Sequence, residues 1–367
     1  MFVVKNRRMA KRIQLGDAIS MKVIMTKLKS LKKHPGLTRE QEKAVRDYYY
    51  PFKVSTLLHR EMLDVTGEFR PEYLPSEMFY AYLDGRFNSR ERSVGLENKC
   101  LFPKLYPGIP QPASVAYRMN GFWLSPDYAP MEWEEVLSAV EQKDELFIKQ
   151  ADDSFGGAGV RHLSAKKSGG SLRGAFADAV NEMRGDVIVQ RAIRQHADIA
   201  AINPSSVNTF RICSMLTEGG VRLLGAILRF ASGDQSVDNF TSGGLACGVD
   251  ENGRLKKFAY SSTGRFEVHP SSGIRFEGYQ LPSFDKAAAL VKKAHPMLPY
   301  FRLVGWDIAI SEDGEPVMIE ANLCSLGIAA IQMVCGPLFG ADTKRIVTEA
   351  LEGTDYPVYN KKRRKNQ

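Results

Sequence analysis

Cysteine is scarce in this sequence, and its few residues are scattered. The 367 residues include 5 cysteines, and no two of them stand in a C-x-x-C arrangement. An odd number of scattered cysteines argues against a disulfide framework and against a structural zinc site. The simpler interpretation is a protein of the reducing cytoplasm.

The sequence also lacks a long hydrophobic run. No N-terminal apolar stretch resembles a signal peptide, and the longest weakly polar run, residues 326–340, is shorter than the ~20 residues that a membrane helix requires. Gln332 and Pro337 interrupt this run. We therefore expect it to be buried core in a cytoplasmic protein, whose contact with a membrane, if there is one, is peripheral.

Positive charge is concentrated at the two ends of the chain. The formal net charge is +8, but residues 1–33 carry +9 and residues 361–365 carry +5, so residues 34–360 are net −6. Residues 21–34 also place apolar side chains at helical spacing, which suits packing on the protein or lying on a membrane surface. Basic ends attract anionic lipid or an acidic polymer, although most charged ends are only solvated. We do not expect nucleic acid as a partner.

Length and composition are those of an ordinary globular enzyme. Hydrophobic residues make up 44% and charged residues 25%, which excludes the disordered and collagen-like classes. A chain of 367 residues suits two or three domains. We expect a helical, basic region over residues 1–95, two α+β lobes over 96–192 and 193–355, and a disordered basic tail over 356–367.

The N-terminal region has helix signals. Thr38 and Gln41 have the spacing of a capping box, which predicts one long helix from there to about Gly67. In the next helical stretch, 73–88, Ser76 is the expected cap. A stripe of Met, Phe and Tyr side chains behind it is expected to be buried core.

From about residue 96 onward, strand and helix patterns alternate. Helical periodicity covers residues 133–143, 171–183 and 283–295. Strands are expected over 145–149, 186–192, 208–216, 221–230, 244–250, 254–260, 302–310 and 315–322. The later strands are joined by short turns such as Asn252-Gly253 and Asp313-Gly314, so we expect a largely antiparallel sheet.

A glycine-rich loop follows one of these strands. Neither the G-K-[ST] of a P-loop nor a G-x-G-x-x-G turn is present there; instead, in FIKQADDSFGGAGV, Lys149 precedes Gly156, Gly157 and Gly159. Glycines let backbone N–H groups approach a polyphosphate closely. The loop can therefore close over phosphates that Lys149 reaches from the strand, although an ordinary surface hairpin explains the same residues.

A second constellation lies in the C-terminal part. The strands GWDIAI and EPVMIEAN are joined by a short turn, so Asp307 and Glu320 should lie on neighbouring antiparallel strands. Because side chains alternate along a strand, Glu320 and Asn322 should share one face. Two carboxylates and an amide oxygen are ligands suited to Mg²⁺. The alternative is a surface hairpin with solvated acids, but apolar neighbours make an unpaired charge costly there.

Together, these segments resemble the ATP-grasp superfamily. The resemblance rests on Lys99 in ENK, on FIKQADDSFGGAGV, and on GWDIAI with IEAN. More narrowly, residues 195–212 (QHADIAAINPSSVNTFRI), 238–253 (DNFTSGGLACGVDENG) and 269–273 (HPSSG) are similar to the sugar-transfer-associated ATP-grasp family. The resemblance implies an α+β fold in which two lobes clasp ATP, with a helical N-terminal segment in front.

The resemblance also implies a nucleotide site with one or two Mg²⁺ ions. Asp307, Glu320 and Asn322 would hold the metal, and Arg211 would face the transferred phosphoryl group or an acyl phosphate. The ribose contact is open between His196 and Asp198. The remaining nucleotide contacts would come from Lys99, Lys149, Gly156, Gly157, Gly159, Gln190, Ala192, Ile193 and Asn239. Gln190 stands where the superfamily commonly has an acidic residue.

The sequence indicates the residues that would bind the amine substrate less clearly than those that would bind the nucleotide. His269, in the HPSSG loop, could orient or deprotonate an incoming amine, although many loop histidines have no such role. The turn that contains Asn239, Ser242, Gly243 and Gly244 has free amides that could clamp a phosphate or a substrate, or it could be a plain tight turn. Cys324 follows the metal strand without an evident histidine partner, so we expect it to be structural.

Three functions therefore remain under consideration. The leading one is an ATP- and Mg²⁺-dependent ligase that joins a carboxylate to an amine through an acyl phosphate, in the synthesis of a polysaccharide or a small metabolite. A phosphotransferase acting on a hydroxyl group would use the same site. A non-catalytic protein that binds an anionic polymer through its basic ends is the third, and its affinity should fall steeply with salt.

Overall fold

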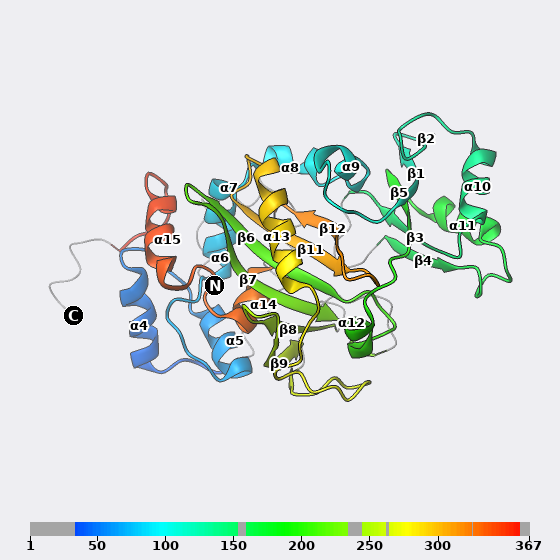
Figure 1. The fold of residues 1–367 in the computed structure, drawn as a ribbon. Coiled ribbons are helices and arrows are strands. Elements are labelled where there is room, and N and C mark those ends of the chain that lie inside the picture. The colour runs from blue at the N-terminus through cyan, green and yellow to red at the C-terminus, as the bar shows by residue number, and fades with distance from the viewer. Residues whose placement is uncertain (1–33, 153–158, 234–243, 262–263, 325, 360–367) are drawn as a thin grey trace. The chain divides into compact units, whose positions relative to one another are not determined.

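The structure, a computed structural model, describes residues 34–152, 159–233, 244–261, 264–324 and 326–359. This part of the chain does not include several predicted features: Gly156, Gly157, Asn239, Ser242, Gly243, most of the amphipathic segment 21–34 and the basic residues 361–365. The chain forms two compact units (Figure 1). One contains the N-terminal residues up to Arg90, a short piece at Tyr300–Leu303, and the chain from Cys324 onward; the other contains Glu91–Pro299 and Val304–Leu323.

The described part of the first unit begins with two helices where the sequence predicted one. Helix α4 (Arg39–Tyr49) starts at the predicted capping box, in which Thr38 Oγ1 accepts the Gln41 N–H and Gln41 Oε1 accepts the Thr38 N–H. It ends before Pro51, and α5 (Leu57–Thr66) follows a non-helical stretch. A residue that precedes proline avoids the helical region. The prediction of a single long helix is therefore wrong.

The stretch 73–88 forms successive helical turns. These are α6 (Ser76–Met78), the π-helical η1 (Phe79–Leu83) and α7 (Asp84–Phe87). The predicted stripe of Met, Phe and Tyr side chains is buried. Pro75 occupies the cap position and no side chain caps the helix, so the prediction that Ser76 caps it is wrong by one residue.

Residues from the C-terminal part complete this unit. They form α14 (Ile328–Cys335), η5 (Gly340–Asp342) and α15 (Thr343–Leu351). Most of residues 326–340 are buried, which confirms that this run is core. The buried Gln332 accepts the N–H of Leu74 at 2.7 Å and donates to its carbonyl at 3.1 Å.

The start of the expected disordered tail is ordered instead. Tyr356 is buried and donates its hydroxyl to the carbonyl of Lys53 at 3.0 Å. Val358 forms an antiparallel bridge with Phe52. The expectation of disorder is therefore wrong for residues 356–359, and the rest of the tail lies outside the described residues.

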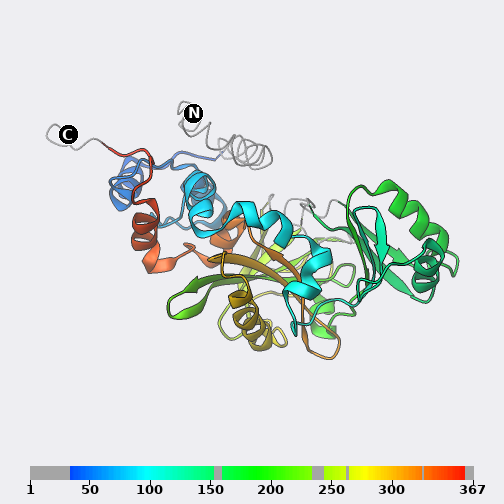
Figure 2. The ribbon, with the colours of Figure 1, turned by 90° about the horizontal axis from the view of Figure 1, so that it is seen from above.

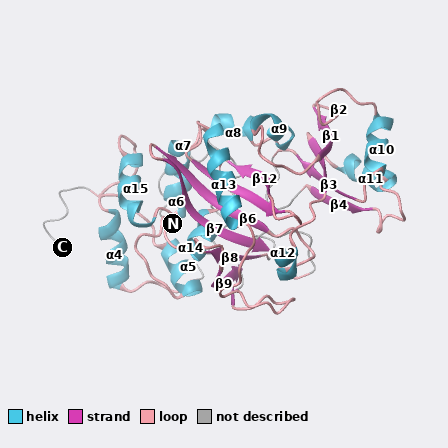
Figure 3. Cartoon of the chain, in the orientation of Figure 1, coloured by secondary structure: helices cyan, strands magenta, loops and turns pink. Residues whose placement is uncertain are grey.

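In the second unit, the described residues include a five-stranded antiparallel sheet of order β2-β1-β5-β3-β4 (Figure 3). Its strands are β1 (Ser114–Met119), β2 (Phe122–Leu124), β3 (Glu145–Gln150), β4 (Val160–Ser164) and β5 (Val187–Arg191). Helices α10 (Trp133–Glu141) and α11 (Arg173–Glu182) share one hydrophobic core with it. The predicted helices and strands of this region are confirmed, whereas β1, β2 and β4 were not predicted.

The described residues of this unit also form a seven-stranded sheet of order β10-β9-β8-β7-β6-β11-β12. Its strands are β6 (Thr209–Thr217), β7 (Gly220–Phe230), β8 (Leu245–Val249), β9 (Leu255–Ser261), β10 (Gly264–Phe266), β11 (Leu303–Ile310) and β12 (Pro316–Asn322). The hairpin pairings are antiparallel, as predicted. Helix α13 (Phe284–Ala294), also predicted, lies beside the sheet (Figure 2). All eight residues of β11 are buried, so this strand runs through the core.

Short helices connect these elements. They are α8 (Arg90–Leu96), η2 (Lys99–Leu101), α9 (Phe102–Leu105), α12 (Ala197–Ile202) and η4 (His295–Met297). None of the described helices combines the length and the apolar composition that crossing a bilayer requires.

Candidate active site

The β11–β12 hairpin places the predicted oxygen ligands together. Asp307 lies directly opposite Glu320, and Gly305 lies opposite Asn322, so the three polar side chains share one face of the sheet. Trp306 points to the other face, where its indole N–H donates to Ser214 Oγ at 2.8 Å. The predicted pairing of the two strands is confirmed.

Two arginines hold Asp307. Arg211, on β6, donates to both carboxylate oxygens, with its Nη2 at 2.9 Å from Oδ2, and Arg229, on β7, lies 3.0 Å from Oδ2. Burial alone would raise the pKa of Asp307, which is 3% exposed, but the charges of Arg211 and Arg229 and hydrogen bonds from Arg211 and Asn322 hold its pKa below the usual value. Asp307 is therefore ionised and fixes both guanidinium groups in place.

Arg229 was not identified from the sequence. Its guanidinium also donates to Thr209 Oγ1 at 2.9 Å, and Thr209 is its register partner on β6. The available signal was that Arg229 is the single charged residue in the apolar run 223–231. A buried charge needs a partner, but nothing in the local pattern indicates that the partner is 78 residues away.

Glu320 is paired with Lys99. Lys99 Nζ lies 3.0 Å from Glu320 Oε1, and the lysine is 8% exposed. The backbone supports this contact, because Lys99 N–H donates to Ala151 O at 2.9 Å and Glu97 Oε1 accepts the N–H of Leu323 at 2.7 Å. Through these two hydrogen bonds, the segment 97–99 contacts both the residue that follows β3 and the residue that follows β12. Glu97, like Arg229, was not identified from the sequence.

These five charged side chains form a compact group, which we call the charged face: Lys99, Arg211, Arg229, Asp307 and Glu320. Three of these side chains are cations and two are carboxylates. Such a surface suits an anionic ligand, and guanidinium groups in particular match phosphate and carboxylate oxygens.

The charged face has two carboxylates, and the neighbouring Asn322 adds an amide oxygen as a third candidate ligand for a hard cation. Among the described residues, no three His, Cys, Asp or Glu side chains come together in a metal-binding cluster. Asn322 Nδ2 donates to Gly305 O at 3.0 Å, so its amide oxygen is the atom left for a metal. Two carboxylates and one amide oxygen match the incomplete protein shell that Mg²⁺ accepts when phosphates and water complete it.

The strand lysine lies where the sequence predicted it. Lys149 is on β3, opposite Val160 on β4 and Ile188 on β5, with its Nζ 5.8 Å from the centre of the Phe147 ring. Strands β3 and β4 flank the glycine loop, so the loop joins a hairpin as expected. The roles of Lys149 and of the loop stay predictions.

Gly159, the last glycine of the loop, has a backbone that requires glycine. Its φ is +78°, and a Cβ there would lie 3.0 Å from Gln150 Cβ and 3.1 Å from Gln150 Oε1. Both the left-handed conformation and the close approach disfavour a side chain. The turn from the loop into β4 is therefore fixed by this residue.

The residues expected near the adenine lie at the end of β5. Gln190 is 7% exposed, and its Nε2 is 3.4 Å from Pro112 O. Ala192 and Ile193 follow the strand, and the Ala192 N–H donates to Glu145 O at 3.3 Å. The structure brings these residues together, and their contact with adenine stays a prediction.

The two ribose candidates are neighbours at the start of α12. His196 is the N-cap residue, and its Nδ1 accepts the Asp198 N–H at 3.2 Å. The Asp198 side chain is 64% exposed against 26% for His196. Asp198 is therefore the more accessible of the two, and the choice between them stays open.

His269 is buried with both ring nitrogens engaged. It is 1% exposed; Nε2 is 2.9 Å from Ala231 O, and Nδ1 accepts the N–H groups of Ser271 and Ser272 at 3.3 and 3.2 Å. These contacts require a proton on Nε2 and a lone pair on Nδ1, and burial lowers the pKa of the ring. The geometry gives His269 a role in holding its turn and offers no nitrogen to an incoming amine.

A family model described as sugar-transfer associated ATP-grasp matches residues 79–346. No curated protein was found to match the chain.

Solved structures that resemble the chain are distant. D-alanyl-alanine synthetase A from Vibrio cholerae is 14% identical, over 72% of this chain and 68% of its own, with a TM-score of 0.42. An L-amino acid ligase from Bacillus licheniformis is 13% identical, over 73% of this chain and 48% of its own, with a TM-score of 0.36. The biotin carboxylase domain of 2-oxoglutarate carboxylase from Hydrogenobacter thermophilus, solved with MgADP, is 14% identical, over 73% and 48%, with a TM-score of 0.41. The chain thus spans about half the length of two of these three proteins.

Proposed function

The chain belongs to the sugar-transfer associated ATP-grasp family, and from this premise we propose that it is an ATP- and Mg²⁺-dependent ligase that joins a carboxylate to an amine. The family model covers more than half of the chain, including both sheets of the second unit. The proposal goes beyond family membership in naming the reaction, the cofactor and the residues.

The observation that carries this proposal is the charged face. Four neighbouring strands of one sheet bring Arg211, Arg229, Asp307 and Glu320 to the same surface, and Lys99 joins them from outside the sheet. Burying this many charges is costly unless they are paired, and the pairs here are made across long sequence separations. A face that combines guanidinium and ammonium groups with oxygen ligands is suited to a nucleotide phosphate chain with its metal.

Glu320 and Asn322 are the residues best placed to hold Mg²⁺, with Asp307 as the third. Asp307 is already engaged by two guanidinium groups, so Glu320 and the Asn322 amide oxygen carry the main part of this assignment. Bound Mg²⁺ would neutralise charge on the phosphate oxygens during phosphoryl transfer.

The phosphates would be held by lysines and by the loop. Lys99 is adjacent to the metal strand, and Lys149 lies on the strand that leads into the glycine loop. Gly156, Gly157 and Gly159 would allow the loop backbone to approach the phosphate oxygens. Asn239 is assigned to the nucleotide side only through the family pattern.

Arg211 and Arg229 are the candidates for binding the reacting group. In the proposed reaction, a carboxylate oxygen of the acid attacks the γ-phosphorus, the bond to the β-phosphate oxygen breaks, and ADP leaves. The amine then attacks the acyl carbon, loses a proton and displaces inorganic phosphate, which leaves an amide. Both steps concentrate negative charge on phosphoryl oxygens, and guanidinium groups already fixed by Asp307 stabilise that charge without reorganising.

For the acid and the amine, we propose a chemical class and no specific compound. The relatives named above include enzymes that join amino acids, and the family name refers to sugar transfer. We propose that the substrates are a small carboxylate and a small amine, and that either group could be attached to a sugar. His269 is left out of the chemistry, because both of its nitrogens are engaged by the backbone.

Calorimetric titration tests the proposal. ATP, ADP and GTP are titrated with and without Mg²⁺ into the wild-type protein, into Lys149→Ala, and into Lys166→Ala, which changes an exposed lysine after the β3–β4 hairpin. Metal-dependent binding of adenine nucleotides that is lost only in Lys149→Ala supports the proposal. No nucleotide binding to folded protein overturns it and favours the polymer-binding alternative.

Phosphate release then separates a ligase from a phosphotransferase. A ligase releases inorganic phosphate only when an acid and an amine are both present, whereas a phosphotransferase gives a stable phosphoester with a single acceptor. Screening amino acids and sugar acids in pairs therefore identifies the reaction and the substrate class in one assay.

A further inference from the structure

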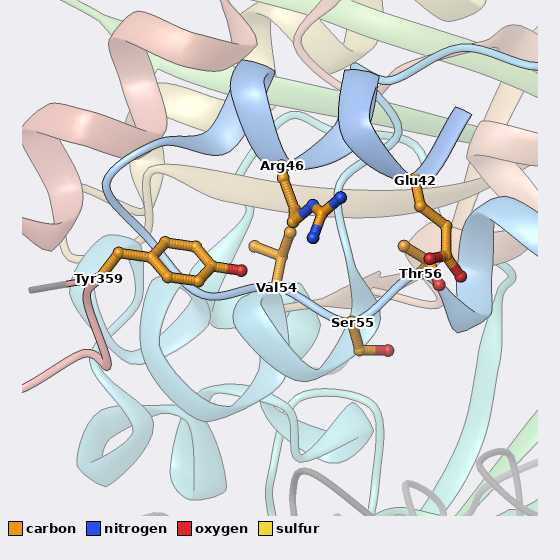
Figure 4. A pocket seen from close by; sticks show the side chains of 6 residues that line it. All are labelled: Glu42, Arg46, Val54, Ser55, Thr56 and Tyr359. Atoms are coloured by element: carbon orange, nitrogen blue, oxygen red, sulfur yellow. The ribbon is translucent and has the colours of Figure 1, made fainter. Parts of the chain in front are cut away.

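The first unit contains a pocket that the proposed reaction does not use. The cavity has a volume of about 230 Å³ and is lined by Glu42, Arg46, Val54, Ser55, Thr56 and Tyr359 (Figure 4). None of these residues belongs to the charged face. The volume is below the ~300–1,000 Å³ typical of sites for drug-sized molecules, so a ligand here must be small.

The walls of the pocket are fixed by the fold. Tyr359 donates its N–H to Pro51 O at 2.9 Å, and its ring stacks on Tyr50 with 6.5 Å between ring centres. On the opposite side, the Ser55 N–H donates to Glu77 Oε1 at 3.1 Å, and Glu77 is only 3% exposed. The pocket therefore does not depend on a single loop conformation.

Two opposite charges of α4 face this pocket without pairing with each other. Glu42 and Arg46 have the i, i+4 spacing that favours an ion pair on a helix. Glu42 instead lies 3.8 Å from Arg60, and the Arg46 side chain makes no hydrogen bond or ion pair among the described residues. Figure 4 shows both side chains extending from the helix toward the segment that carries Ser55 and Thr56. The pocket thus presents a cation and a carboxylate at separate positions.

Hydroxyl groups add polar atoms to the lining of the pocket. Ser55 Oγ accepts the Leu57 N–H at 3.2 Å, and its hydroxyl also hydrogen-bonds the buried Glu77 carboxylate, which fixes its position in the pocket wall. Thr56 is the N-cap residue of α5, and its side chain makes no capping hydrogen bond. Tyr359 contributes a third hydroxyl, and Val54 contributes the apolar surface.

We propose that this pocket binds a small zwitterion of the α-amino acid class. The ligand carboxylate would lie against Arg46 and the Tyr359 hydroxyl, and the ammonium group would lie against Glu42. An anion alone would meet the Glu42 carboxylate, and a cation alone would meet Arg46, so only a ligand with both charges uses the whole pocket. Val54 leaves room for a short apolar side chain. This inference is independent of nucleotide binding and of the ligase reaction.

The test compares a zwitterion with two ligands that each carry only one of its charges. L-alanine, propionate and ethylamine are titrated into the full-length protein by calorimetry, with saturation-transfer NMR to detect weak binding. L-alanine should bind at least about tenfold more tightly than either half, since each half loses one charge contact worth about that factor.

Variants of the two charges give the second part of the test. Arg46→Met and Glu42→Gln should each weaken L-alanine binding at least about tenfold. Lys43→Met, at an exposed position of the same helix, should leave it unchanged. Thermal unfolding of each variant establishes that it is folded, and nucleotide titration checks that the second unit is intact.

Three results would overturn the proposal. The first is no L-alanine binding to the folded wild-type protein. The second is L-alanine binding that survives both charge variants. The third is propionate binding as tightly as L-alanine and gaining affinity in Glu42→Gln, which would identify a site for simple anions.

Discussion

Lys99 and Glu320 form an ion pair with 3.0 Å between Nζ and Oε1, and Glu320 is also the best-placed metal ligand of the proposed site. The same lysine is the residue proposed to hold the nucleotide phosphates. Each partner of the pair therefore has a second, more strongly charged partner in the proposed complex.

Replacing Lys99 tests its ion pair with Glu320 separately from its proposed contact with the nucleotide phosphates. In Lys99→Met, Glu320 loses its cation, so the affinity of the nucleotide-free protein for Mg²⁺ should rise by about tenfold, which corresponds to about 1.4 kcal/mol. The affinity for ATP with Mg²⁺ should fall by at least the same factor, because a phosphate contact is lost. Calorimetry measures both, with Lys292→Met on the exposed face of α13 as the control. Unchanged Mg²⁺ affinity would show that the lysine does not block the metal ligand.

Removing the Asp307 charge should destabilise the fold. Asp307→Asn leaves the guanidinium groups of Arg211 and Arg229 close together and mostly buried without their carboxylate. Breaking a buried pair in this way costs about 3–5 kcal/mol, measured as the free energy of unfolding in urea.

A double-mutant cycle gives the control for this prediction. Arg211→Met combined with Asp307→Asn should cost less than the sum of the single changes, because each change removes the same interaction. If the losses in the free energy of unfolding are instead additive, the interaction between Arg211 and Asp307 does not contribute to stability.

Stability should depend on pH through His59 in the first unit. Burial lowers the pKa of His59 from 6.5 to about 4, and its Nε2 is 3.2 Å from the carbonyl of Pro71. Folding thus favours the neutral ring, so this stabilisation is complete above pH 6.5 and is lost as the pH falls towards 4. The loss should reach about 3 kcal/mol, at 1.36 kcal/mol per pKa unit.

Chemical unfolding between pH 7.5 and 4.5 measures this dependence. His59→Gln keeps a donor for Pro71 O but does not titrate, so its stability should change less with pH in this range. Equal pH dependence in both proteins would contradict the assignment to His59.

Gly159→Ala should affect both stability and the glycine loop. The substituted residue would have to keep a φ of +78° with its Cβ 3.0 Å from Gln150 Cβ. We expect a loss of about 1–2 kcal/mol in the free energy of unfolding and weaker nucleotide binding in the same titration.

Gly174 provides the matched control for this change. It lies in α11, and a Cβ there meets nothing within 4 Å. Gly174→Ala should be neutral or stabilising, because alanine has the higher helix propensity. A Gly159→Ala protein as stable as the wild type would show that the loop adapts to a side chain.

The sequence by itself determined eight strands of the second unit, β3, β5 to β9, β11 and β12, and the pairing of β11 with β12, whereas it did not indicate β1, β2, β4 or β10. Alternating apolar side chains define each strand, and the short turn at Asp313-Gly314 sets Asp307 opposite Glu320. The capping box at Thr38 was predictable for the same reason, since it depends on residues three positions apart. The helix break before Pro51 was visible in the sequence and was missed.

Only the tertiary structure decided which charges meet. The contacts of Asp307 with Arg211 and Arg229, and of Lys99 with Glu320, depend on the strand order β7-β6-β11-β12 and on the path of the segment around Lys99. The burial of His269 depends in the same way on packing against Phe230 and the carbonyl of Ala231. Local patterns specify the periodicity of a strand and not its neighbour in the sheet, because strand order is selected by the packing of the whole core.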